Sequence, residues 1–278
     1  MSLHDVGDWL ASRSNGDVRW GALLLSGLGV ALVDTVGQWL IVTRVGLWIR
    51  PLGLFIIAAT VVLGTAARWG GASALIALGV LQGDWTGGVV SAVAAFVAMT
   101  ITARLWGPDR DVPETPVAWV LRYAVVAVVG ASAFATMSAW LLDVLGRSAF
   151  SVTVVPALAA QVPLAVAGAP VVRPIFERTR RSDWKSSLPA ATATDRRIVL
   201  GVVLCWVCAG YLGSFLFRTV ARVPGAELGP RLSPAIESFV LLWGPQGTYA
   251  QLLLGLVSLA TIAIALRRGE GSRGPERD

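Results

Sequence analysis

The chain contains one histidine, His4, and two cysteines, Cys205 and Cys208. Because His4 lies alone in a polar N-terminal segment, histidine-ligated haem, histidine-based zinc sites and Ser–His–Asp hydrolysis are excluded. The two cysteines are three residues apart in one apolar stretch without further ligands, which favours small packing residues over a redox or metal site. We therefore expect no metal and no cofactor.

Charged side chains are also scarce: they make up 14% of the residues, whereas 55% are hydrophobic. A soluble domain carries about 25% charged residues, so this composition indicates a chain that lies largely outside water. The net charge is +6, but the basic residues gather in particular segments between apolar stretches. Such clustering indicates membrane orientation and not a nucleic-acid-binding surface, so no nucleic-acid partner is expected.

Tryptophan, in contrast, is plentiful and regularly placed. The indole ring has an apolar body and one N–H donor, so it concentrates where lipid chains meet water. A helix of about 20 residues covers about 30 Å, the thickness of the hydrocarbon core of a bilayer. The pattern therefore predicts an integral membrane protein. Four pairs of tryptophans flank apolar stretches at about this spacing: Trp20 and Trp39, Trp48 and Trp69, Trp85 and Trp106, and Trp119 and Trp140.

The apolar windows predict an all-α integral membrane protein with about eight transmembrane helices joined by short loops, which together form a membrane domain over residues 20–266. The third and fourth helices are expected to form a tight hairpin through the turn Gln82–Gly88. In chain order, the spans are expected near 20–43, 51–67, 71–84, 86–105, 117–143, 149–172, 197–217 and 248–266.

The distribution of arginine and lysine predicts the orientation of these spans. If the basic segment Arg173–Arg197 is cytoplasmic, 17 basic residues lie inside and six lie outside. Because positive charge accumulates on the cytoplasmic side, both termini are predicted there, in a protein of the cell membrane. Residues 1–19 then form a cytoplasmic segment with a candidate interfacial helix, and 267–278 a disordered cytoplasmic tail. Residues 231–246 form an external element, either interfacial or re-entrant.

Asp34 is the sharpest candidate for a site residue, because it follows the apolar run Leu28–Val33 in the first span. An ionised aspartate in the bilayer centre costs about 2.5–3.5 kcal/mol, so such residues normally face a cavity or a partner. Gln38 lies one turn further on the same helix face. The pair indicates a ligand or proton site, and the alternative is a buried polar pair that holds two helices together.

Asp84 and Trp85 follow the hairpin turn at the outer end of the fourth span. As an N-cap, the Asp84 carboxylate would satisfy free N–H groups and complement the helix dipole. The functional alternative places Asp84 on the rim of an outward-facing site, with Trp85 stacked on a ligand. The predicted ligand-binding residues are therefore Asp34, Gln38, Asp84 and Trp85.

The basic segment before the seventh span contains Arg178, Arg180 and Arg181. Their spacing is typical of an amphipathic strip on anionic lipid, and the alternative role is docking of a cytoplasmic partner protein. Arg122, at the inner edge of the fifth span, is expected to extend its guanidinium to the membrane surface.

The chain contains, in order, the motifs Pro51–Ala58, Gly64, Arg68–Trp69, Ile76–Asp84 and Gly87–Gly88. This order of a Pro/Gly-led span, a short turn and a span ending in a glycine-containing hairpin resembles the first type of membrane-associated sensor domain. The family implies eight spans, normally joined to a histidine kinase or a cyclic-dinucleotide enzyme. This chain ends where that output domain would begin, so the resemblance implies signalling through a separate protein.

The hairpin pattern also resembles the substrate-binding components of energy-coupling-factor transporters. In those proteins a small-xxx-small helix face docks the transport partner, and Gly27–Ala31 matches such a face. A third class is a membrane enzyme that acts on lipid-linked substrates. Asp109, Asp111 and Glu114 would supply its acidic groups, although neighbouring prolines favour a solvated loop.

We expect a non-catalytic, membrane-embedded ligand-binding or sensory module, with no catalytic residue, that binds a small molecule and signals through a separate partner. The alternatives are the substrate-binding component of a small-solute transporter and, third, the lipid enzyme.

Overall fold

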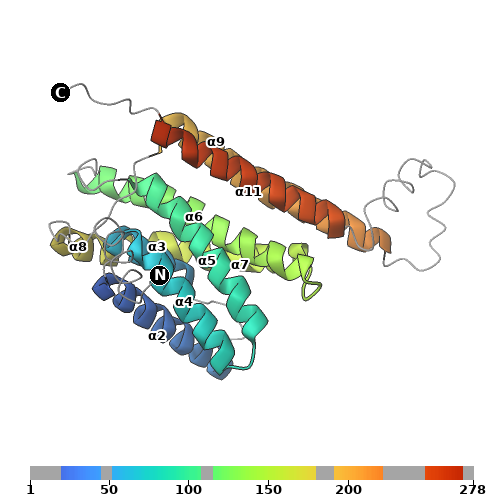
Figure 1. Ribbon diagram of the computed structural model, residues 1–278, viewed down its shortest axis with the longest axis horizontal. Helices are drawn as coiled ribbons and strands as arrows, with labels where there is room; N and C mark the ends of the chain where they lie inside the picture. The colour runs from blue at the N-terminus through green and yellow to red at the C-terminus, as the bar shows by residue number, and fades with distance from the viewer. Residues whose placement is uncertain (1–19, 45–51, 108–114, 180–190, 222–247, 272–278) are drawn as a thin grey trace, which may run out of the picture. The chain divides into compact units, whose positions relative to one another are not determined.

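The described part of the chain is helical. The computed structural model describes residues 20–44, 52–107, 115–179, 191–221 and 248–271, and these ranges contain no β-strand. The predicted all-α class is confirmed for them. Their helices (Figure 1) are α2 (Trp20–Arg44), α3 (Leu52–Leu63), α4 (Ala66–Leu81), α5 (Trp85–Trp106), α6 (Pro116–Val144), α7 (Phe150–Ala167), α8 (Ala169–Thr179), α9 (Ala193–Ala221) and α11 (Thr248–Gly271).

Five of the described helices are long and apolar enough to cross a membrane, namely α5, α6, α7, α9 and α11. Three further apolar stretches, Trp20–Val36, Leu52–Leu63 and Ala66–Leu81, are shorter. At about 1.5 Å per residue, α3 and α4 are shorter than the hydrocarbon core of about 30 Å. Length and composition therefore support five candidate spans and three further, shorter apolar stretches.

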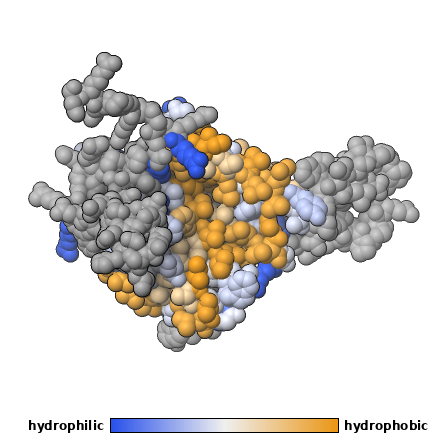
Figure 2. All heavy atoms as spheres, in the orientation of Figure 1, coloured by the Kyte–Doolittle hydropathy of each residue, from blue (hydrophilic) through white to orange (hydrophobic). Residues whose placement is uncertain are grey.

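The outward face of α2 is apolar. Leu24, Leu28 and Leu32 recur at four-residue spacing and are 59%, 69% and 65% exposed. Hydrophobic side chains also cover much of the described surface visible in Figure 2. Soluble monomers rarely expose contiguous apolar patches larger than a few hundred Å², so such a face suits lipid chains better than water.

The connection between α3 and α4 lies earlier than the sequence predicted. Spans were expected near 51–67 and 71–84, but α3 ends at Leu63 and α4 begins at Ala66. Gly64 makes the turn with a φ of 70°, a conformation that residues with a Cβ rarely adopt. A single glycine therefore ends one helix and allows the next to begin two residues later.

The sixth expected span, 149–172, is also divided. Helix α7 ends at Ala167, and a separate amphipathic helix, α8, begins at Ala169. The buried side of α8 is formed by Ala169, Val172 and Phe176, and this helix contacts α3. The chain thus leaves the apolar run and continues as a short helix with one buried and one exposed face.

The helices group into two compact units. Unit 1 consists of Met1–Phe134 and Ala159–Thr192, and unit 2 of Ala135–Leu158 and Ala193–Asp278. Helices α6 and α7 are each divided between the two units. Unit 1 also contains α2, α3, α4, α5 and α8, and unit 2 contains α9 and α11.

Glycines let the helices of unit 1 approach closely. A Cβ on Gly27 of α2 would lie 3.1 Å from the backbone oxygen of Gly70 in α4. A Cβ on Gly88 of α5 would lie 2.7 Å from the Cα of Gly79 in α4. Because lipid removes the hydrophobic drive for helix association, such backbone-to-backbone packing contributes much of the stability of helix pairs.

Helices α4 and α5 form the predicted tight hairpin. Gly83 turns the chain with a φ of 74°. Asp84 is the N-cap of α5, and its carboxylate accepts a hydrogen bond of 3.1 Å from the backbone N–H of Gly87. The capping role considered for Asp84 is therefore confirmed.

A chain of hydrogen bonds joins the helices of unit 2. Trp140 of α6 donates its indole N–H to the backbone oxygen of Gln251 in α11 over 2.7 Å. The Gln251 amide then donates to the backbone oxygen of Gly210 in α9 over 2.8 Å. Trp140 also packs edge-on against Trp206 of α9, with ring centroids 5.7 Å apart. Buried polar bonds and aromatic packing together fix α9 and α11 side by side (Figure 1).

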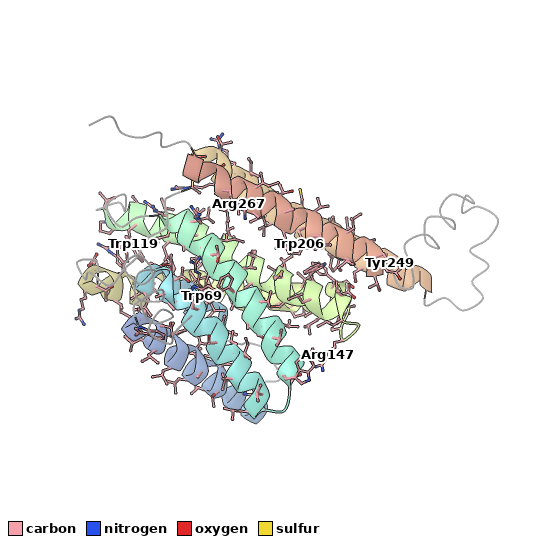
Figure 3. All side chains as sticks on the ribbon, in the orientation of Figure 1. Trp69, Trp119, Arg147, Trp206, Tyr249 and Arg267 are labelled. Carbon is pink, nitrogen blue, oxygen red and sulfur yellow. The ribbon has the colours of Figure 1, made fainter. Side chains whose placement is uncertain are left out.

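Cys205 and Cys208 lie on the exposed face of α9 as free thiols. The expectation that they are packing residues is therefore wrong. Trp206, labelled in Figure 3, is 2% exposed and occupies the buried face of this helix. Neighbouring positions differ by about 100° around a helix, so the two cysteines are turned away from that face.

Candidate functional site

Asp34 is buried inside unit 1, where it is 5% exposed. It follows Val30 by four residues and Gly27 by seven, so the three share one face of α2. That face packs on α4, because Gly27 lies against Gly70 and Val30 lies 3.4 Å from the position of a Cβ on Gly71. The Asp34 carboxylate therefore belongs to the α4-facing side of α2.

Gly27 and Val30, which share this face of α2 with Asp34, are small or apolar, and another face of α2 carries the exposed leucines. A carboxylate there loses the solvation that water would give, at a cost of about 2.5–3.5 kcal/mol in a bilayer. Such a residue can stabilise a positive charge or a hydrogen-bond donor strongly, because the local dielectric is low.

The other predicted ligand-binding residues lie in different environments. Gln38 belongs to the α2 helix, but its side chain lies outside the described residues. Asp84 and Trp85 are exposed, and the Trp85 ring is 65% exposed. The structure thus separates one buried acid, Asp34, from a surface pair at the start of α5. A tryptophan in that position suits the membrane interface.

The predicted docking arginines are described only in part. Arg178 is exposed near the end of α8, whereas Arg180 and Arg181 lie outside the described residues. On the same helix, Arg173 pairs with Glu177 over 2.7 Å. The exposed part of α8 therefore carries charged side chains, together with the apolar Val171 and Ile175.

Sequence reasoning did not find an aromatic cluster at the end of unit 1 where α5 ends and α6 begins. The cluster consists of Trp106, Trp119, Tyr123 and Phe176, which are 3%, 2%, 0% and 1% exposed. Trp119 stacks on Tyr123 with centroids 5.3 Å apart, and Phe176 of α8 lies 5.4 Å from Trp106. Trp119 is labelled on α6 in Figure 3.

Arg122 covers one side of this aromatic cluster. Its guanidinium carbon lies 5.3 Å from the centre of the Trp106 ring, and it donates a hydrogen bond to the Trp106 backbone oxygen. The expectation that Arg122 extends to the membrane surface stays a prediction. A cation at the last carbonyls of α5 is favoured, because those groups lack helical partners and form the negative end of the helix dipole.

Three donors of the aromatic cluster are buried without a hydrogen-bond partner in the structure as described: the indole N–H groups of Trp106 and Trp119 and the hydroxyl of Tyr123. A buried donor that lacks a partner costs about 1–3 kcal/mol, so three in one cluster is a large local penalty. Arg104, two residues before Trp106 on α5, is 9% exposed.

Gln161 is a second polar residue that sequence reasoning missed. It is 8% exposed, and its Oε1 lies 2.8 Å from the position of a Cβ on Gly53, in the first turn of α3. Glycine at position 53 makes room for the glutamine side chain. Among the described residues, this oxygen is buried without a hydrogen-bond partner.

Within the described ranges, no three His, Cys, Asp or Glu side chains come together as ligands for a metal ion. The acidic set Asp109, Asp111 and Glu114 lies outside those ranges. Comparisons with protein-family models, with curated proteins and with solved structures found no match to this chain.

Proposed function

We propose that this protein is a non-catalytic, membrane-embedded binding module that recognises a small polar solute through Asp34 and signals through a separate partner protein. The burial of Asp34 in the α4-facing side of α2 carries this proposal. Structural polar groups in membrane helices are usually neutral, whereas an intramembrane carboxylate is costly and marks a functional site.

The chemistry of Asp34 defines the class of solute. A carboxylate in a low-dielectric site selects a cation or a molecule with several hydrogen-bond donors, such as an amine. Gln38, one turn further along α2, adds an amide that can both donate and accept. The solute class is therefore a small amine that also carries an acceptor group.

The proposed topology has eight spans with both termini in the cytoplasm. Five long apolar helices and three shorter apolar stretches supply the segments. The split of 17 basic residues inside and six outside supports the orientation. Arg178, Arg180 and Arg181 then lie on the cytoplasmic side, where anionic lipid or a partner protein is within reach.

Replacing Asp34 by asparagine or alanine should abolish stabilisation by the solute. The test measures the melting temperature of purified protein in detergent with a panel of amino acids, polyamines, and sodium and potassium ions. A ligand at 100 times its Kd adds about 2.7 kcal/mol to the stability of a protein that binds it only when folded. Wild type should respond to at least one amine, and both variants should not.

Asp195→Asn is the matched control, because Asp195 is 4% exposed and lies in the first turn of α9, in unit 2. It should keep the wild-type response. If both Asp34 variants respond to the panel as wild type does, Asp34 does not bind the solute.

The packing of Gly27 within the chain favours signalling over transport. A transport component would present the Gly27–Ala31 face to its partner, whereas Gly27 here lies against Gly70 of the same chain. Co-purification from cell membranes identifies the partner. A kinase or response protein supports the proposal, and an ATPase pair with a coupling subunit supports transport.

A further inference from the structure

The apolar residues of α8 cover more of this helix than the fold buries. The buried side, formed by Ala169, Val172 and Phe176, packs on α3. Val171 and Ile175 lie on a neighbouring side and are 66% and 44% exposed. Because the contact with α3 fixes the rotation of α8 about its own axis, this exposed apolar pair points away from the fold in a defined direction.

The side of α8 opposite this exposed apolar pair is polar. Arg173 lies two residues from each member of the pair, which is about 160° around a helix of 3.6 residues per turn. It forms an ion pair with Glu177 over 2.7 Å. Pro174, one turn before Glu177, lies inside α8, so the backbone oxygen of Pro170 cannot receive the usual helical N–H. Lipid offers no substitute for that hydrogen bond, so this side of α8 suits water.

The position of α8 in the chain places it next to the bilayer. Helix α7, a candidate membrane span, ends at Ala167, and only Gly168 separates it from α8. With 11 residues, α8 is about 16 Å long, roughly half the thickness of the hydrocarbon core. It therefore begins where a candidate span ends and is too short to cross the bilayer itself. A helix with an apolar and a charged side in this place is typical of the membrane interface.

We propose that α8 docks on anionic phospholipids at the bilayer surface, with Val171 and Ile175 among the acyl chains and Arg178 at the level of the phosphates. Arg178 is exposed and lies seven residues after Val171, which is two turns along the same side of the helix. The charges of Arg173 and Glu177 balance each other, so Arg178 supplies the net positive charge of α8. A guanidinium beside an apolar surface favours an anionic lipid over a neutral one.

The orientation of α8 is tested with a fluorophore on a single introduced cysteine, in lipid nanodiscs, after replacement of Cys205 and Cys208 by alanine. Labels on Val171→Cys and Ile175→Cys should be quenched by brominated acyl chains and protected from aqueous iodide. A label on Glu177→Cys should show the reverse. Iodide quenching of all three labels would show that both sides face water. Protection of the label at position 171 from both quenchers would show that protein covers this side, and either result would overturn the proposal.

The preference for anionic lipid is measured with the same label at position 171, by comparing quenching by brominated phosphatidylglycerol and brominated phosphatidylcholine in equal mixtures. The parent protein should prefer phosphatidylglycerol, and Arg178→Gln should lower this local preference about fivefold, the contribution of one basic residue at an anionic surface. The double variant Arg173→Gln/Glu177→Gln keeps the net charge and should leave the preference unchanged. Equal quenching by both lipids in the parent, or an unchanged preference in Arg178→Gln, would contradict the proposal. Asp34→Asn should keep the preference, so this result is independent of the solute site.

Discussion

Gly88→Val will disrupt the α4–α5 hairpin and produce the largest loss of stability among single substitutions in unit 1. A Cβ at position 88 would lie 2.7 Å from the Cα of Gly79 and 2.9 Å from the backbone oxygen of Leu75. Both neighbours are backbone atoms, so no flexible side chain can move aside. Overpacking costs about 1–3 kcal/mol where side chains can adjust, and we expect about 3 kcal/mol or more here.

The loss is measured as the free energy of unfolding in mixed detergent micelles. Gly201→Ala is the control, because a Cβ at position 201 of α9 would have no atom within 4 Å. That change should leave the stability unchanged or raise it by up to about 1 kcal/mol, since alanine favours helices more than glycine does. A Gly88→Val protein as stable as wild type would contradict the close approach of α4 and α5.

Trp140→Ala should have the largest effect in unit 2. The indole packs against Trp206, bonds to the backbone oxygen of Gln251 and fills the space over Gly255. Its removal leaves a cavity in an apolar interior and takes one hydrogen bond away from the backbone oxygen of Gln251. Replacing a buried tryptophan by alanine costs about 3–5 kcal/mol, and we expect a loss in this range.

Two further variants test the explanation of the Trp140 effect. Trp140→Phe keeps an aromatic ring but removes the donor, so it should cost about 1 kcal/mol from the lost hydrogen bond. Trp20→Ala, at a position that is 69% exposed, should change stability by about 0.5 kcal/mol or less. Equal effects of Trp140→Ala and Trp20→Ala would show that Trp140 does not join the helices of unit 2.

The sequence predicted the α4–α5 hairpin well, because its determinants are local. Gly83 and the capping residue Asp84 lie within the turn itself, and Gly87 provides the backbone N–H that Asp84 binds. A capping side chain acts over three residues, so its effect can be read without knowledge of the rest of the fold. The burial of Asp34 remained an expectation until the packing of α2 on α4 was known.

Helix boundaries were harder to predict. A hydropathy window averages over about 19 residues, so it joins neighbouring apolar helices that a single glycine separates. Gly64 divides α3 from α4 in this way, and α7 ends before α8 within another expected span. The turn depends on backbone conformation at one residue, and hydropathy carries no such information.

The aromatic cluster could not be predicted, because its members come from three separate helices. Trp106 ends α5, Trp119 and Tyr123 begin α6, and Phe176 belongs to α8. Each tryptophan fits the interfacial role that membrane-width spacing implies, and only the packing shows that these two are buried together. The proximity of Trp119 and Arg122 on one helix was the available signal.

Labelling of single cysteines in intact cells tests the proposed topology most directly. With Cys205 and Cys208 replaced by alanine, one cysteine is introduced at Leu145, which is 51% exposed between α6 and α7. Another is introduced at Ser186, within the arginine-rich segment before α9. The eight-span topology predicts that a membrane-impermeant maleimide labels position 145 in intact cells and position 186 only after permeabilisation. Labelling of position 186 from outside, with protection of position 145, would contradict it.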